Sequence, residues 1–432
     1  MMTRRALLAG AGSLLAVRGT RAEEPLDVVV VGAGAAGLAA AKELRAAGLT
    51  CRVVEARSRV GGRVHTDTGL GAPFDAGAQY IHWGERNPWK PIAERLGARL
   101  AEDEPGGPPR VYIDGRPITG DERARRRAAF GQVWSLLNEG DGTDRSFADL
   151  PGHASPEVLS AAAAITRLSL GEEPARVSLA DYRQLWAGDD YLLPDGYGTL
   201  VARYGADVPV SLDTPVRAVD WSGPGVVVET ERGALRARAA IVTASVGVLR
   251  SGGIRFVPDL PAPLASALEG LGMGAYTKLA LGLDPARVGD LPADDLFEII
   301  GGAMASYEFR PFGHPLAMAY LGGDHARSLS EAGEREAVAW ATDRLAALLG
   351  SRVRGAIRGG RLADWWTDPY ARGSYSIARP GHGAARAVLQ QPVAERVFLA
   401  GEAGAGPGAM TAGGAVLDGI RAARAVARQL QG

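Results

Sequence analysis

Residues Val28–Gly37 read VVVVGAGAAG, a run of four valines followed by a glycine-rich turn. An alanine-rich segment of helical composition continues to about Ala47. In a chain with 59 glycines, the offsets of Gly32, Gly34 and Gly37 are expected about once by chance and carry little information alone. Their place between a strand and a helix predicts a phosphate-binding turn, because glycine lets the backbone approach a pyrophosphate that the helix N-terminus stabilises.

A second strand pattern, Cys51–Val54, ends in Glu55, 18 positions beyond Gly37. An acidic side chain at this place can accept hydrogen bonds from both ribose hydroxyls of an adenine nucleotide. Gly62 and Arg63 then offer a second close approach to phosphate, with a guanidinium that can bind it through two hydrogen bonds. The order strand, turn, helix, strand and carboxylate therefore predicts an α/β fold with a Rossmann-like dinucleotide-binding domain.

The composition argues against several classes of function. Lys and Arg total 48 and Asp and Glu total 49, so no basic excess is available for a phosphate backbone and we expect no nucleic-acid partner. Cys51 is the only cysteine, and the six histidines show no metal-ligand spacing, so we expect no metal. The hydrophobic share of 46% excludes a disordered chain.

Residues 1–22 have the three-part pattern of an export signal. Arg4 and Arg5 precede the apolar run Ala6–Val17, and small residues occur at 20–22. As a helix the apolar run is roughly 18 Å long, shorter than the ~30 Å hydrocarbon core, so we expect no stable membrane insertion of the mature protein. The pattern predicts a twin-arginine-type signal peptide, the twin-arginine export machinery as a partner and a periplasmic location. A basic N-terminal arm is the alternative.

Beyond Glu55 the chain resembles the flavin-containing amine oxidase family, which includes monoamine and polyamine oxidases. Ser245 stands where the family usually has proline. Six ordered blocks carry the resemblance: ARSRVGGR at 56–63, DAGAQYIH at 75–82, PDGYGTL at 194–200 with TPV at 214–216, TASVGVL at 243–249 with FVPDLP at 256–261, WWTDP at 365–369 with GSY at 373–375, and FLAGE at 398–402.

The resemblance implies a discontinuous domain organisation and FAD as cofactor. A Rossmann-like FAD-binding domain would comprise 24–84, 195–273 and 390–432, and an α+β substrate-binding domain 85–194 and 274–389. The attachment would be noncovalent, because Cys51 is too early in the chain for the covalent link seen in some relatives. The implied FAD-binding residues are Gly32, Gly34, Ala36, Gly37, Glu55, Arg57, Gly62, Arg63, Gly77, Ala78, Gln79, Tyr80, Val216, Gly401, Glu402, Thr411 and Ala412.

Three residues are predicted to carry the chemistry: Lys278, Tyr375 and Thr411. Only three lysines occur in this arginine-rich chain, so a retained lysine is consistent with a need for a compact amine. In the family, a lysine in the setting of Lys278 holds a water at flavin N5, and an aromatic residue at the position of Tyr375 lines the substrate amine. Thr411 takes the place of a second aromatic residue, which weakens the transfer of a simple monoamine preference.

The leading hypothesis is FAD-dependent oxidation of an amine: hydride transfer to flavin N5, imine hydrolysis and reoxidation by O2 to give H2O2. One alternative is an L-amino-acid oxidase of the same superfamily, which would need an arginine near Tyr80 to bind the substrate carboxylate. Another is a nicotinamide dehydrogenase, which would not need the blocks at 61–63 and 401–402. A flavin-binding scaffold without turnover would not need Lys278.

Hydrophobic periodicity also predicts individual elements. The expected helices are 121–139, 156–170, 330–349 and a terminal helix from about Thr411, and the expected strands include 226–229 and 277–283.

Overall fold

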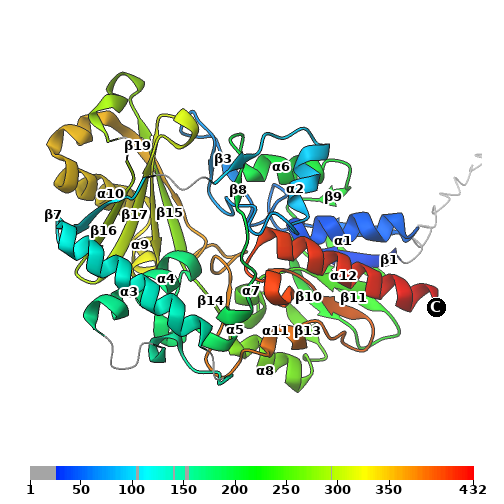
Figure 1. Ribbon diagram of the computed structural model, residues 1–432. Coiled ribbons are helices and arrows are strands. Elements are labelled where there is room, and N and C mark those ends of the chain that lie inside the picture. The colour runs from blue at the N-terminus through cyan, green and yellow to red at the C-terminus, as the bar shows by residue number, and fades with distance from the viewer. Residues whose placement is uncertain (1–25, 104–106, 140–141, 151–154, 293) are drawn as a thin grey trace, which may run out of the picture.

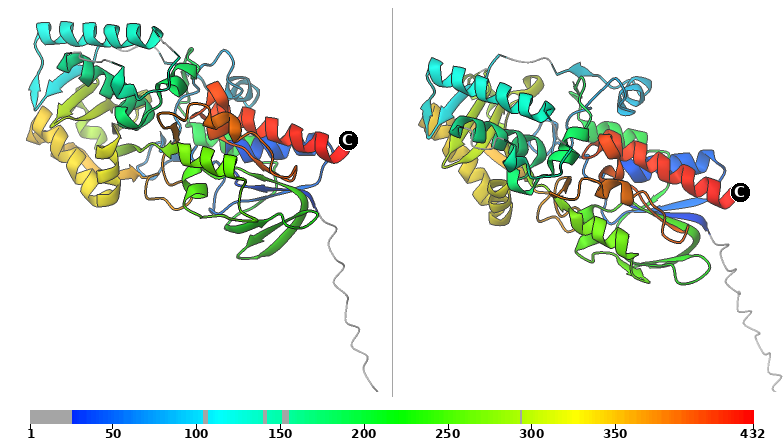
Figure 2. Two further views of the ribbon diagram at one scale, coloured as in Figure 1. Left: turned by 90° about the horizontal axis from the view of Figure 1, so that it is seen from below. Right: turned by 60° about the horizontal axis from the view of Figure 1, so that its bottom comes forward.

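The computed structural model describes residues 26–103, 107–139, 142–150, 155–292 and 294–432. The predicted signal peptide, residues 1–22, lies outside the described residues. Two large sheets organise the fold, with the helices packed around them, and Figures 1 and 2 show the two sheet regions side by side. The predicted α/β class is confirmed.

The first sheet has eight strands and carries the valine run at its centre. Its order is β13-β10-β11-β12-β1-β2-β9, with β21 paired to β12, and β1 is parallel to both β2 and β12. Val28–Val31 are buried, as expected for a strand covered on both faces. The strands are β1 Leu26–Val31, β2 Cys51–Val54, β9 Val210–Ser211, β10 Val216–Asp220, β11 Val226–Thr230, β12 Gly233–Val242, β13 Arg255–Val257 and β21 Val397–Leu399.

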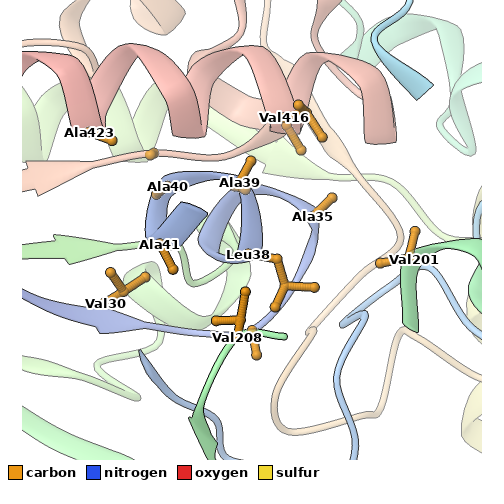
Figure 3. Close-up of a cluster of buried hydrophobic side chains, with 14 of the residues drawn as sticks. Val30, Ala35, Leu38, Ala39, Ala40, Ala41, Val201, Val208, Val416 and Ala423 are labelled. Carbon is orange, nitrogen blue, oxygen red and sulfur yellow. The ribbon is translucent and has the colours of Figure 1, made fainter. Parts of the chain in front are cut away.

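Two helices from opposite ends of the chain pack against each other beside this sheet. They are α1, Ala35–Ala46, and α12, Ala412–Gln431, drawn in blue and red in Figure 1. Figure 3 shows α12 side chains packed over the alanine-rich face of α1. A Cβ on Gly419 would lie 2.2 Å from the Ala36 carbonyl oxygen, so the helices approach too closely for a larger residue there. This packing holds the N-termini of both helices at one edge of the sheet.

The second sheet has seven strands in the order β19-β15-β18-β17-β16-β6-β7, antiparallel except for β16 with β6. Leu279 and Leu281 point to the face covered by two helices, α9 (Asp324–Ala332) and α10 (Glu334–Leu349). Lys278 and Ala280 therefore point to the opposite face, as strand periodicity predicts. The strands are β6 Arg110–Ile113, β7 Arg116–Pro117, β15 Tyr276–Leu283, β16 Leu296–Ile300, β17 Ala303–Phe309, β18 Leu316–Gly322 and β19 Ile357–Ala363.

The longer predicted helices form with one correction. Helices α3, Gly120–Asn138, and α4, Pro156–Leu170, agree with prediction. The predicted helix at 330–349 is instead two helices, α9 at Asp324–Ala332 and α10 at Glu334–Leu349. Gly333 separates them at φ +89, a left-handed conformation that ends a right-handed helix.

Short elements connect the two sheets. The helices are α2 Trp89–Arg95, α5 Leu179–Gln184, α6 Tyr197–Tyr204, α7 Val246–Arg250, α8 Ala262–Gly270 and α11 Ala385–Val388, and the short strands are β3 Thr66–Asp67, β4 Phe74–Asp75, β5 Ala101–Glu102, β8 Tyr191–Leu192, β14 Leu271–Met273 and β20 Ser376–Ala378. The domain limits stay a prediction. Across the described segments, no helix combines the length and the apolar character needed to cross a bilayer.

Candidate active site

A large cavity of about 1620 Å³ runs between the two sheets. At one end it is lined by the glycine-rich turn after β1, and further along it is lined by Lys278 and Tyr375. Every predicted site residue lines this cavity except Gly37. Gly37 has a packing role instead, because a Cβ there would lie 1.9 Å from the Gly32 carbonyl oxygen. The other predicted residues therefore share one cavity, and Gly37 packs behind its wall; the roles of these residues stay predictions.

The turn after β1 fits a pyrophosphate. Gly32 has φ +101, a conformation that favours glycine. No side chain caps α1, so its first amides are not satisfied by a capping group and point toward the cavity end. An uncapped helix N-terminus of this kind binds anions through its N–H groups and its dipole.

Glu55 fits the ribose role that its position predicts. Its side chain is 7% exposed and lines the cavity. Oε2 accepts a hydrogen bond from the Ala33 amide at 2.8 Å, and Oε1 accepts one from the Arg57 amide at 2.9 Å. Each carboxylate oxygen has two lone pairs, so these bonds fix the carboxylate and leave acceptor capacity for ribose hydroxyls.

The two predicted arginines have different partners. Arg63 donates to Glu402 Oε1 at 3.0 Å and to the Ser374 carbonyl at 2.9 Å. Burial raises the pKa of Glu402, but Arg63 and Arg386 lower it, and the net pKa lies below its ordinary value. Arg57 instead forms a bidentate pair with Asp368, at 2.8 and 2.6 Å. Each arginine is therefore held on the cavity wall by an acidic partner, Arg63 by Glu402 and Arg57 by Asp368.

Lys278 lies on β15, where the two sheets meet. Its side chain is 5% exposed, and Nζ donates to the Asp75 carbonyl at 2.9 Å and to Gln79 Oε1 at 2.8 Å. Burial lowers the pKa of Lys278 to about 8, against the opposing effect of Asp75 and Glu308. An ammonium has three donors, so one remains for a water or ligand in the cavity.

Tyr375 and Thr411 line the cavity near the N-terminus of α12. The Tyr375 hydroxyl donates to the Ser169 carbonyl at 3.2 Å, which fixes its ring. Thr411 caps α12: Oγ1 accepts from the Gly414 amide at 2.9 Å and donates to the Gly408 carbonyl at 2.8 Å. Helix capping therefore accounts for a threonine at position 411, because threonine is a preferred N-cap residue.

Part of the cavity wall was not predicted from the sequence. Four carboxylates and two further tyrosines line its far end: Asp103, Asp190, Asp295, Glu308, Tyr276 and Tyr320. None of the carboxylates belongs to a recognised motif. The alternation of polar residues at 306 and 308 in a strand pattern was the only available signal. Within the described ranges, no group of three or more His, Cys, Asp and Glu side chains is arranged to hold a metal ion.

Replacing Glu55 by Ala should weaken FAD binding. The loss of two charge-assisted hydrogen bonds to ribose, each worth about 1.5–3 kcal/mol, predicts a dissociation constant at least ten times higher. The measurement is a titration of apoprotein with FAD. The Glu269→Ala variant, at an exposed residue outside the cavity, is the control. An unchanged affinity in Glu55→Ala would contradict the ribose assignment.

Comparisons with known proteins point to one family. A family model described as flavin containing amine oxidoreductase matches residues 35–167 and 121–427. The lysine-specific histone demethylase 1 homolog 1 of Oryza sativa subsp. japonica is 30% identical over 94% of this chain and 52% of its own length. Polyamine oxidase 4 of the same organism is 26% identical over 95% of this chain and 91% of its own.

Solved structures show the same fold. Cyclohexylamine oxidase from Brevibacterium oxydans IH-35A has a TM-score of 0.78 and 22% identity, and the match covers 95% of this chain and 100% of that one. The chain spans about half the length of the first curated relatives it matches. FAD is the cofactor of these homologues and of this protein, as predicted. Noncovalent attachment stays a prediction; Cys51 does not line the cavity. The chain belongs to the flavin containing amine oxidoreductase family.

Proposed function

We propose that this protein oxidises a small-molecule amine and passes the electrons to O2. The observation that carries the proposal is the buried Lys278 ammonium, which lies in the same cavity as the nucleotide cradle and keeps one donor free. When bound, FAD supplies a two-electron acceptor for a hydride. The net reaction converts an amine and O2 into an imine and H2O2, and water then hydrolyses the imine to a carbonyl compound, with release of ammonia from a primary amine or of the smaller amine from a secondary one.

The chain's own residues support amine binding. The ring centres of Tyr375 and Tyr276 are 6.3 Å apart, and those of Tyr276 and Tyr320 are 6.4 Å apart. Three aromatic rings therefore line the cavity wall beside Lys278. Aromatic faces attract cationic groups and exclude water, which favours an amine whose nitrogen must become neutral before it gives up hydride. The Lys278 ammonium holds a water by its free donor and places a positive charge where negative charge develops.

The carboxylates of the far end argue against an L-amino-acid substrate. Tyr80 carries no positive charge, and Arg183, which also lines the cavity, donates to the Leu137 and Leu136 carbonyls. A substrate carboxylate would meet Glu308 and its acidic neighbours, and like charges at short range repel. The partners that we propose are therefore an amine and O2.

Replacing Lys278 by Met should leave FAD bound and slow reduction by amine, reoxidation by O2 or both, by roughly tenfold or more. Met has a similar length but neither charge nor donor. Since the pKa of Lys278 is about 8, any rate that depends on its ammonium should fall as the pH rises through about 8, and the Met variant should lack this step. Rapid mixing without and then with O2 measures both half-reactions.

Two further variants sharpen this test. Lys278→Arg should not restore the rates, because the guanidinium is broad and does not deprotonate near neutral pH. Lys90→Met removes a partly exposed lysine that is paired with Glu94 outside the cavity, and this variant should match the parent. If both half-reactions of Lys278→Met equal those of the parent, Lys278 has no part in the chemistry.

We further propose that the protein is exported to the periplasm by the twin-arginine machinery. The support is the sequence of residues 1–22, with Arg4 and Arg5 before a short apolar run. Replacing both arginines by Lys should keep the protein in the cytoplasm with its N-terminus uncleaved. Fractionation and N-terminal mass spectrometry measure this, and normal cleavage of the double variant would contradict the proposal.

A further inference from the structure

Arg386 is a buried arginine whose five N–H donors are all matched. It lies on α11 and is 4% exposed. Nε and Nη2 donate to the two carboxylate oxygens of Asp181 at 2.7 and 2.9 Å. Nη1 donates to the Ser376 hydroxyl at 2.6 Å and to the Ala403 carbonyl at 3.2 Å, and Nη2 also donates to the Ser376 carbonyl at 3.1 Å. This guanidinium therefore joins α11 to three other segments: α5, β20 and the turn that follows β21.

The contacts continue from Arg386 to the wall of the cavity. A hydroxyl has one proton, so the Ser376 hydroxyl, which accepts from Arg386, is left to donate elsewhere. It donates to Glu402 Oε2 at 2.7 Å, and the Ser376 amide donates to the same carboxylate. Glu402 lines the cavity, whereas Arg386 and Ser376 lie behind the wall. Arg386 therefore acts on the cavity through Ser376.

Glu402 holds Arg63 in place on this wall. Both hydrogen bonds of Arg63, to Glu402 and to the Ser374 carbonyl, use Nη1. Within the described ranges, Nε and Nη2 thus keep three N–H donors for an anion in the cavity, and a guanidinium can bind a phosphate of FAD through two of them. Burial raises the pKa of Glu402, but Arg63 and Arg386 lower it to below its ordinary value. A neutral or rotated Glu402 would release Arg63.

Stability alone does not account for the pair of Arg386 and Asp181. Burying two charges removes them from water, and well-packed apolar residues of similar volume often give equal or greater stability. What a guanidinium offers in exchange is geometry, because its planar fork fixes several acceptors at once. Here those acceptors include the Ser376 hydroxyl, which leads to the cofactor end of the cavity.

We propose that Arg386 is a positioning residue for FAD binding. Held by Asp181, Arg386 orients the Ser376 hydroxyl toward Glu402. Glu402 in turn holds Arg63 in place for a phosphate group of FAD. This role concerns the cofactor alone and does not depend on which amine is oxidised.

The first test removes the hydroxyl that connects Arg386 to Glu402. Ser376→Ala leaves the buried ion pair in place, because Nε and Nη2 of Arg386 keep their carboxylate acceptors. The dissociation constant of FAD should rise roughly tenfold or more, as expected for a lost hydrogen bond to a charged group. Dilution of FAD-loaded protein, followed by the fluorescence of released FAD, measures it. Ser330→Ala removes a similarly buried hydroxyl that pairs with Thr277 outside the cavity, and it should leave the constant unchanged.

Two further variants separate positioning from folding. Arg386→Met leaves the Asp181 carboxylate buried without its cation, so the apoprotein should unfold at a lower temperature and bind FAD weakly. Adding Asp181→Leu removes the unpaired charge and should recover most of the lost stability. The dissociation constant of FAD in this double variant should nevertheless stay at least tenfold above that of the parent, because Ser376 has lost its guanidinium donor. Thermal unfolding of the apoprotein and the dilution assay measure the two effects.

A second buried pair provides the matched control. Glu298 is fully buried in the second sheet and pairs with Arg344 outside the cavity. The double variant Glu298→Leu with Arg344→Met should bind FAD as tightly as the parent.

The outcomes decide between a positioning and a structural role. If FAD affinity returns together with stability in Arg386→Met with Asp181→Leu, or if Ser376→Ala binds FAD like the parent, Arg386 is only structural and the proposal is overturned. Arg386→Lys keeps the charge but not the planar fork, so it should bind FAD more weakly than the parent. Full affinity in Arg386→Lys would show that charge is sufficient and would contradict the positioning role.

Discussion

The hydrogen bonds of the Lys278 ammonium to the Asp75 carbonyl and to Gln79 tie the two halves of the molecule together. A buried ammonium is unfavourable unless its donors are matched, so this lysine needs both partners to be held in place. The Asp75 carboxylate in turn accepts from the Tyr197 and Gly198 amides at the start of α6. One polar junction thus connects β15 of the second sheet to the segments that line the nucleotide end of the cavity.

The acidic side chains at the two ends of the cavity differ in their partners. At the nucleotide end the acids are satisfied internally: Arg386, 4% exposed, binds Asp181 and also donates to Ser376, whose hydroxyl donates to Glu402. At the other end the acids have fewer internal partners. There Asp190 contacts His82 and Glu308 accepts from Tyr320. A cavity whose acids pair with arginines at one end and with neutral or weakly basic groups at the other is suited to an anionic cofactor at the first end and a cationic substrate at the second.

The sequence predicted the parts of this arrangement that depend on local pattern. The strand, turn and helix around Gly32, the carboxylate of Glu55 and the helix that begins after Thr411 follow from glycine conformation, strand periodicity and capping. The Gly333 break in the predicted 330–349 helix was overlooked because alanine and leucine composition continues across it. The partner of Arg57, Asp368, and the place of Glu308 depend on tertiary pairing between distant segments, which no local pattern records.

We infer that one cavity brings FAD and an amine together beside Lys278. The most direct test measures the visible absorbance of the purified flavoprotein mixed with an aliphatic amine in the absence of O2. We expect one equivalent of amine to bleach the flavin absorbance completely, and the admission of O2 to restore it with release of one equivalent of H2O2. An absorbance that stays unchanged with every member of a series of aliphatic amines, in protein with its full complement of FAD, would contradict this inference.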